Sequence, residues 1–330
     1  MPDSKRTRSE SASPANVIRS LLTALDEIER GAGSGTLTWP GARLEVTNLR
    51  KPFWPKLKLT KGDLFRHYVR VAPFILPVLA DRPLVMKRFP NGIAGPPFYQ
   101  HRAPDKVPAG VRIEPVEASS ETRPHVIGGT LATLLYTAQL GSISQDPWFS
   151  RVGTPDVIDH VAIDLDPPDG LPYRRVLDVA RWVRDALATL KTDGFAKTSG
   201  AGGLHVYVPL RPGTSYESGF LFAQLVATIV AEKHPQHATV ERSIKARGKR
   251  IYVDYMQNAL GKTLASAYSA RASEFAGVST PITWEEVDAG VSPKDFTIGN
   301  FAERLKSAGD PWAGLRKAKG ADLGALRRKR

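Results

Sequence analysis

Apolar residues recur every three or four positions near the start of the chain, which predicts an amphipathic helix. Ser13 suits the N-cap and Pro14 the first helical position, and Gly31 or Gly33 is expected to end the helix. The sequence LTWPGARLEVTNL then alternates like a β-hairpin, with its turn at the Pro-Gly pair.

A second helix is predicted from Thr60, which can form a short capping box with Asp63. Two prolines inside its apolar pattern, Pro73 and Pro77, are expected to break or kink it. Further along, RPLVMKRFP is typical of a strand, GIAGPPFYQHRAP of a loop and TLATLLYTAQL of a short helix.

Three later segments have β character, and helical patterns separate them. The segments are HVAIDLDPPDG (160–170), FAKTSGAGGLHVYVPL (195–210) and KRIYVDYMQN (249–258). The first helical pattern between them runs through residues 176–190 and the second through 220–230. This alternation predicts a mixed α/β protein.

The amino-acid composition excludes several classes of protein and of chemistry. With 42% apolar residues among 330, the chain can bury a sizeable core, and the absence of cysteine excludes disulfides, thiolate zinc sites and cysteine catalysis. The sequence has neither an apolar run of membrane-spanning length nor the apolar core of a signal peptide, so a cytoplasmic protein is expected. We expect an N-terminal extension with one helix (1–35), a catalytic domain (36–315) and a basic tail (316–330).

Positive charge is concentrated in three places. Lys and Arg number 46 against 33 acids, a net charge of +13, and the basic clusters lie at 42–61, 241–250 and 316–330. Such clusters commonly contact nucleic-acid phosphates, although each could also be a solvated basic face.

Asp164 and Asp166 end the apolar run VAIDL, so on a strand both point to one face with Cα atoms roughly 7 Å apart. Two carboxylates so placed repel unless protonated or bridged by cations, and oxygen ligands suit Mg²⁺ or Mn²⁺. The alternative is a turn, which Asp-Pro-Pro-Asp-Gly also favours.

Asp254, in the apolar strand RIYVDY, could complete a two-metal site opposite that pair, or form a salt bridge to a nearby basic residue. Between the strands, a glycine-rich turn followed by His205 offers a close approach for phosphate, with Ser199 as a hydroxyl. The turn matches neither a P-loop nor a dinucleotide fingerprint.

Together DLDP (164–167), KTSGxxGLHVYVPL (197–210) and VDYxQNxxGKT (ending at Thr263) resemble the polymerase domain of bacterial ligase D, in the archaeo-eukaryotic primase superfamily. The resemblance runs from about Leu44 to Trp312 and includes LTKGDL, DPWFSRV, YSARA and DFTIGN. It implies a primase-polymerase fold of the α/β (α+β) class, with a mixed or antiparallel β core flanked by helices. Because no ligase domain follows, we expect a stand-alone primase-polymerase of the actinobacterial kind.

The resemblance also implies roles for individual residues. The catalytic residues that would bind two Mn²⁺ or Mg²⁺ ions are Asp164, Asp166 and Asp254. The residues expected to bind the triphosphate of the nucleotide are Ser199, His205 and Arg271. Tyr99 is expected to stack on a base, and the further nucleotide-binding candidates are Gln257 and Asp146. The pocket for a downstream DNA 5′-phosphate would contain Asn48, Lys51 and Lys61, and further candidates for contact with DNA or nucleotide are Lys87 and Arg88.

Three positions depart from the family pattern. Asp146 replaces a His and would repel nucleotide phosphates unless it meets a metal; Gly202 replaces a common Lys, and Gln257 stands where some relatives have Arg.

The expected function is that of a template-dependent DNA/RNA primase-polymerase, preferring ribonucleotides and filling short gaps in DNA repair or end joining. Its expected partners are gapped or broken DNA with a 5′-phosphate and ribo- or deoxyribonucleoside triphosphates. The candidate protein partners are a separate ligase and an end-binding protein. A nucleoid-associated monomer is expected. The alternatives are a catalytically degenerate DNA-end or gap-binding module and a DxD glycosyltransferase, against which the basic tail argues.

Overall fold

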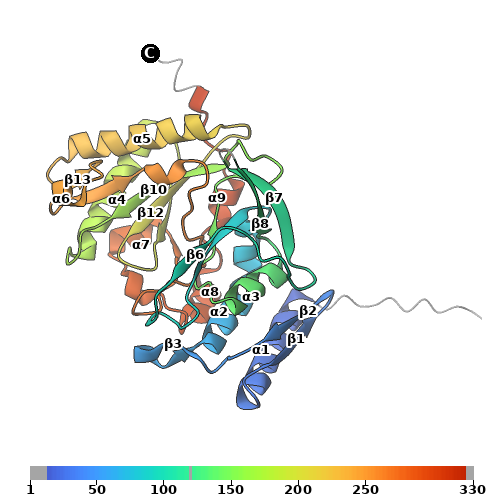
Figure 1. The fold of residues 1–330 in the computed structure, drawn as a ribbon. Coiled ribbons are helices and arrows are strands. Elements are labelled where there is room, and N and C mark those ends of the chain that lie inside the picture. The colour runs from blue at the N-terminus through green and yellow to red at the C-terminus, as the bar shows by residue number, and fades with distance from the viewer. Residues whose placement is uncertain (1–12, 119–120, 325–330) are drawn as a thin grey trace, which may run out of the picture.

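A six-stranded sheet lies at the centre of the computed structural model, which describes residues 13–118 and 121–324 (Figure 1). Its strands, in spatial order, are β13 (Ala238–Thr239), β14 (Ile251–Asp254), β10 (His160–Asp166), β12 (Leu204–Pro209), β11 (Phe195–Thr198) and β15 (Pro281–Ile282). Only β13 and β14 pair in parallel. The predicted α/β (α+β) class with a mixed, mainly antiparallel β core is therefore confirmed.

Two helices cover one face of this sheet. They are α4 (Tyr173–Thr189) and α5 (Tyr216–Lys233), which pack against each other and against β10 and β12. Gly219 of α5 lies so close to Val161 that a Cβ atom there would stand 3.0 Å from the valine side chain. The buried side chains of Val161, Ile163 and Leu165 thus occupy the helix-covered face, which leaves the alternate positions of β10 for the opposite face.

A second sheet faces the candidate catalytic side of the first. Its strands are β6 (Phe98–Gln100), β5 (Pro83–Arg88), β8 (Glu121–Ile127) and β7 (Arg112–Ala118), with β9 (Asp146–Pro147) also pairing with β5. The prediction of a loop across 92–104 is wrong at β6, which pairs with β5 through main-chain hydrogen bonds that its Pro-rich flanks concealed. The β7–β8 hairpin was not predicted.

The helix predicted from Thr60 is α2 (Lys61–Leu79), and its capping box with Asp63 is present. The helix is not interrupted at Pro73 or Pro77, so a break is wrong, and the alternative of a kink stays a prediction. Its packing explains the difference, because Val71, Ile75 and Leu79 remain buried before, between and after the two prolines and hold this half of the helix against the core.

The N-terminal elements surround this helix. They are α1 (Pro14–Arg30), β1 (Gly35–Trp39), β2 (Ala42–Val46), β3 (Pro52–Trp54), the 3₁₀ turn η1 (Pro55–Leu57), β4 (Leu59–Thr60) and the adjoining α3 (Leu131–Gln139). Of these, α1, β4 and α3 pack directly on it. Ser13 caps α1 as predicted. Leu21 and Leu25 of α1 belong to the main core, and the domain boundary near residue 35 stays a prediction.

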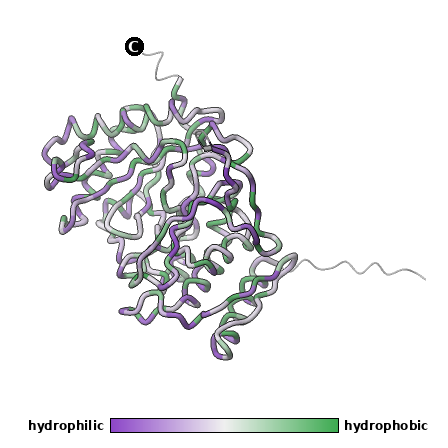
Figure 2. The backbone as a smooth tube through the Cα atoms, viewed as in Figure 1, coloured by the Kyte–Doolittle hydropathy of each residue, from purple (hydrophilic) through white to green (hydrophobic). Residues whose placement is uncertain are grey.

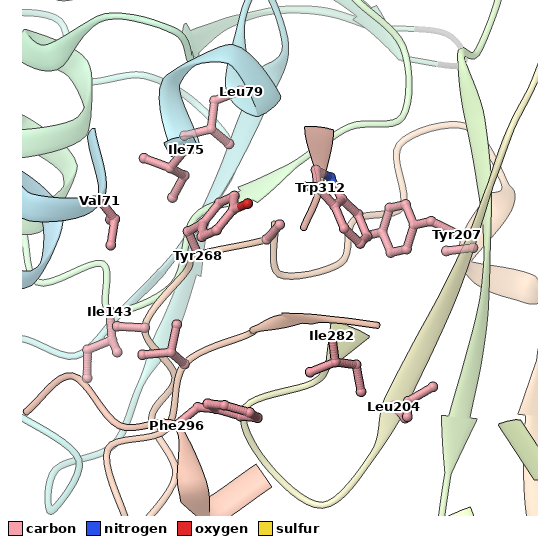
Figure 3. Close-up of a cluster of buried hydrophobic side chains, with 14 of the residues drawn as sticks. Val71, Ile75, Leu79, Ile143, Leu204, Tyr207, Tyr268, Ile282, Phe296 and Trp312 are labelled. Atoms are coloured by element: carbon pink, nitrogen blue, oxygen red, sulfur yellow. The ribbon is translucent and has the colours of Figure 1, made fainter. Parts of the chain in front are cut away.

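The last part of the described chain packs against the core. It comprises α6 (Ile244–Arg247), η2 (Met256–Asn258), α7 (Trp284–Ala289), η3 (Pro293–Asp295), α8 (Phe301–Ala308) and α9 (Ala313–Lys317). Figure 3 shows Tyr268, Phe296 and Ile282 in the buried cluster between α2 and the central sheet. The Ser-rich start (1–12) and the end of the basic tail (325–330) lie outside the described residues.

Hydrophobic and hydrophilic residues alternate over short distances along most of the chain (Figure 2). Within residues 13–118 and 121–324, no helix has the length and apolar character needed to cross a membrane.

Candidate active site

Four charged or titratable side chains form a row across the central sheet. Lys197 on β11 lies opposite His205 on β12, His205 opposite Asp164 on β10, and Asp164 opposite Asp254 on β14. Directly opposed residues of antiparallel strands share a face, so the row lies on the face that α4 and α5 leave open. Asp166 follows two positions along the same face.

The carboxylates of this row repel one another. Burial, and then the charges of Asp254 and Asp166, raise the pKa of Asp164 to about 7. Its Oδ1 lies 3.3 Å from Nε2 of His205. The site therefore favours positive charge beside Asp164.

The other two carboxylates already have protein partners. Arg247, from the basic cluster 241–250, lies with Nη1 3.1 Å from Oδ2 of Asp166. Asp254 accepts hydrogen bonds from the amide of Met256 at 2.7 Å and from Nε2 of Gln257 at 3.0 Å. Gln257 thus orients a catalytic candidate.

Three carboxylates at one sheet edge fit a divalent cation in their chemistry, since Mg²⁺ and Mn²⁺ prefer oxygen ligands. In the described part of the chain, however, no three Asp, Glu or His side chains are arranged to hold one ion. Arg247 and Gln257 instead engage Asp166 and Asp254. The three carboxylates fit a divalent cation in their chemistry, and the side chains of Arg247 and Gln257 would need to turn away before all three could bind it.

Lys197 was not predicted as a site residue, although it is fully buried in the row. Its Nζ lies 2.7 Å from Nδ1 of His205 and donates to the carbonyl of Ala265 and the hydroxyl of Ser279, at 2.9 and 2.6 Å. Burial and the nearby Arg271 lower its pKa. The signal in the sequence was a lysine inside the strand FAKT, two residues after the apolar Phe195 and so on the same face.

A cavity of about 520 Å³ opens beside Asp164 and Asp166. The other predicted residues that line it are Lys87, Tyr99, Asp146, Ser199, Gly202, His205 and Arg271. The glycine-rich turn is held by Ser199, whose Oγ accepts from the amides of Ala201 and Gly203 at 3.1 and 3.0 Å. Arg271 reaches the same turn and donates to the carbonyl of Ser199 at 2.6 Å.

Asp146 lies on the opposite wall of this cavity. Burial raises its pKa, although Arg271 and a 2.7 Å hydrogen bond from Ser144 oppose the shift. Lys87 also lies nearby, with its ammonium 5.4 Å from the ring centre of Tyr99. The Tyr99 side chain is 63% exposed, so its ring is free to stack on a planar group.

Arg88 lies apart from the cavity. Its guanidinium donates to the carbonyl of Leu140 at 2.8 Å and to Oε1 of Gln100 at 2.9 Å. Those bonds tie β5 to neighbouring elements, which suits a structural role.

Of the three residues expected to bind a 5′-phosphate, two lie at the surface and one is buried. Asn48 and Lys51 line a surface depression, and Lys51 donates to Asn91 at 2.7 Å. Lys61 is buried below, where its Nζ donates to the carbonyl of Thr47 and to Oε1 of Gln139. Burial, with the charges of Lys51 and Arg88, lowers the pKa of Lys61 to about 8.

Comparisons with known proteins agree with this geometry. The model of the family described as LigD, primase-polymerase domain, matches residues 60–312. A bifunctional non-homologous end joining protein LigD from Bacillus subtilis is 31% identical over 271 residues, covering 82% of this chain and 44% of that protein. A multifunctional LigD from Pseudomonas aeruginosa is 30% identical over 303 residues, covering 91% and 36%.

A solved structure of the polymerase domain from Mycobacterium tuberculosis ligase D in complex with DNA superposes with a TM-score of 0.77. It is 28% identical, and the match covers 83% of this chain and 98% of that one. The fold and site thus define a primase-polymerase domain. The chain belongs to the LigD primase-polymerase family, and it spans less than half the length of the curated relatives that it matches. Family membership leaves the glycosyltransferase alternative without support.

Proposed function

We propose that this protein is a template-dependent nucleotidyltransferase of DNA repair that extends a primer by adding nucleotides. In the reaction, the primer 3′-hydroxyl attacks the α-phosphate of a bound nucleoside triphosphate and pyrophosphate leaves. The observation that carries the proposal is Asp164, set between His205 and Asp254 in one register row beside a cavity that Arg271 and Lys87 also line.

Different side chains of the cavity would bind different parts of the nucleotide. Arg271 would present guanidinium donors to a triphosphate, and His205 would present Nε2 from the neighbouring strand. Tyr99, at the exposed rim, would stack on a base. These contacts would align the α-phosphate beside Asp164 and Asp166.

Asp164, Asp166 and Asp254 would hold two Mg²⁺ or Mn²⁺ ions. Such ions supply Lewis-acid charge that activates the attacking hydroxyl and stabilises the leaving pyrophosphate. Release of Asp166 from Arg247 and of Asp254 from Gln257 would complete the ligand set.

We further propose that the enzyme fills short gaps and prefers ribonucleotides, with Asn48, Lys51 and Lys61 binding the downstream 5′-phosphate. Three facts support the phosphate pocket: the local excess of basic residues, the mutual repulsion of Lys51 and Lys61, and the position of Lys61 at the start of α2. Helix N-termini favour anions.

A gapped duplex tests this proposal. Templated addition should be faster with ribonucleotides than with deoxyribonucleotides, and faster with a downstream 5′-phosphate than with a 5′-hydroxyl. Lys51→Met should remove the second difference and keep the first. No addition with either Mg²⁺ or Mn²⁺, together with tight gap binding, would instead favour the catalytically degenerate binding module.

A further inference from the structure

A second cavity, of about 490 Å³, lies behind the candidate active site and shares no lining residue with it. Residues that are neighbours in the sequence line the two cavities from opposite sides of a shared wall. Asp146 faces the catalytic cavity and Pro147 the second one, and the neighbours Ala265 and Ser266 divide in the same way. Its volume falls within the range of small-molecule sites.

Several polar atoms of this second cavity lack a protein partner. Ser266 is 2% exposed, and its hydroxyl makes no hydrogen bond within the described residues. The hydroxyl of Tyr207 and the indole N–H of Trp312 also make no hydrogen bond within residues 13–118 and 121–324, although neither atom is fully buried. Buried polar groups are nearly always hydrogen-bonded, so the unpaired buried hydroxyl of Ser266, with two further free donors lining the same cavity, favours a ligand that pairs them.

His160 contributes an acceptor beside these donors. Its Nδ1 lies 2.6 Å from the carboxylate of Asp159, to which it must donate. Burial lowers the pKa of His160 despite that carboxylate, so the ring is neutral and Nε2 carries a lone pair. The cavity therefore presents three groups that can donate and one that accepts, the mixed pattern found on the edge of a nucleobase.

The walls are apolar and aromatic. Tyr207 and Trp312 meet edge to face with ring centres 5.2 Å apart, as Figure 3 shows. Prolines and aliphatic side chains make up most of the remaining wall, namely Pro77, Val78, Pro147, Pro209, Leu210 and Leu315. A rigid, flat, largely apolar body suits such a space.

The rim of the cavity is cationic. Arg82 and Arg151 share the single carboxylate of Asp159, at 2.5 and 3.0 Å, and Arg316 pairs with Asp310. Lys319 is exposed at the rim and has no ion-pair partner among the described residues. A ligand with an anionic end would find its counter-charge there.

We propose that this cavity is a second nucleotide site that binds a nucleoside monophosphate, with its base among Tyr207, Trp312 and Ser266 and its phosphate near Lys319. The site is separate from the catalytic cavity and does not depend on the proposed polymerase reaction. An occupant would contact β12 two residues from His205, so the two sites share a strand.

Titration of the full chain with AMP, followed by tryptophan fluorescence, tests the inference because Trp312 lines the cavity. A saturable change is expected that disappears in Trp312→Phe. Lys319→Glu should weaken binding at least tenfold, whereas Lys317→Glu, an exposed charge on the same segment outside the cavity, should not. Adenosine and inorganic phosphate should each bind more weakly than AMP.

Two further variants distinguish binding in this cavity from binding in the catalytic one. Leu315→Trp should fill the second cavity and abolish AMP binding while thermal unfolding shows that the protein still folds. Arg271→Ala, which alters the catalytic cavity, should leave AMP binding intact. Wild-type affinity in Lys319→Glu and Leu315→Trp, loss of binding in Arg271→Ala, or no binding of AMP by the wild type would each overturn the inference.

Discussion

At the residue scale, Asp146 is the side chain whose charge most opposes the proposed chemistry. It lines the catalytic cavity, where a nucleotide would bring negative phosphates, and burial raises its pKa. We predict that Asp146→Asn and Asp146→His lower the KM for nucleotides by roughly fivefold, the effect of about 1 kcal/mol of like-charge repulsion.

The pH dependence of this effect has a definite sign. A raised pKa means that Asp146 loses its charge as pH falls, so the nucleotide KM of the wild type should fall with it. The KM of Asp146→Asn should not respond to this group. Steady-state kinetics from neutral pH down to pH 5 measure both, and a higher KM in Asp146→Asn would contradict the assignment.

Lys61 provides a second pH-dependent prediction, in the opposite direction. Because burial lowers its pKa to about 8, its positive charge is present below that pH and disappears as pH rises through it. The preference for a 5′-phosphate over a 5′-hydroxyl should therefore decline between pH 7 and 9. Lys61→Met should show a small preference throughout that range, and an unchanged decline in this variant would assign the effect to another group.

Single residues could be predicted from the sequence where a motif carried them. The resemblance named Asp164, Asp166, Ser199, His205 and Arg271, and the structure places all five along one cavity, while their roles stay predictions. Lys197 was missed because its importance depends on strand register, which places it opposite His205. The contact of Gln257 with Asp254, rather than with the cavity, likewise depends on the 3₁₀ turn that follows β14.

At the scale of elements, the glycine-rich turn between β11 and β12 shapes the catalytic cavity. Gly200 has φ +73°, and a Cβ atom there would lie 2.8 Å from the main chain of Val278. We predict that Gly200→Ala displaces the turn, destabilises the protein by about 1–3 kcal/mol and raises the nucleotide KM. Gly202→Ala is the matched control, since its nearest neighbour would be 3.9 Å away.

Thermal unfolding and nucleotide titration of the two alanine variants give the comparison. Equal behaviour of Gly200→Ala and Gly202→Ala would show that the turn tolerates a side chain at both positions, and that its backbone conformation does not set nucleotide affinity.

Elements with strong local signals were predicted well, and those built by long-range pairing were not. The capped helices α1 and α2 begin where Ser13 and Thr60 place them. In contrast, β6 is a short strand that exists because β5 lies beside it, and no local pattern distinguishes it from a loop. The uninterrupted course of α2 through Pro73 also depends on tertiary packing.

At the scale of the whole molecule, we expect the net positive charge to contribute to DNA affinity. The final residues 325–330 contain four of the 46 basic side chains. We predict that deleting them reduces the slope of log K against log salt for duplex DNA by up to about 0.9 for each phosphate that the tail neutralises. Fluorescence anisotropy across a series of salt concentrations measures the slope, and an unchanged slope would show that the tail binds no phosphate.

The central claim is that Asp164 and its neighbours catalyse nucleotide addition. Extension of a primer on a gapped duplex by the wild type, Asp164→Ala and Asp254→Ala, with DNA binding measured in parallel, tests it most directly. We predict metal-dependent, templated addition by the wild type and a loss of at least a thousandfold in both variants, with DNA affinity retained. Addition at the wild-type rate by either variant would contradict the assignment of these carboxylates to catalysis.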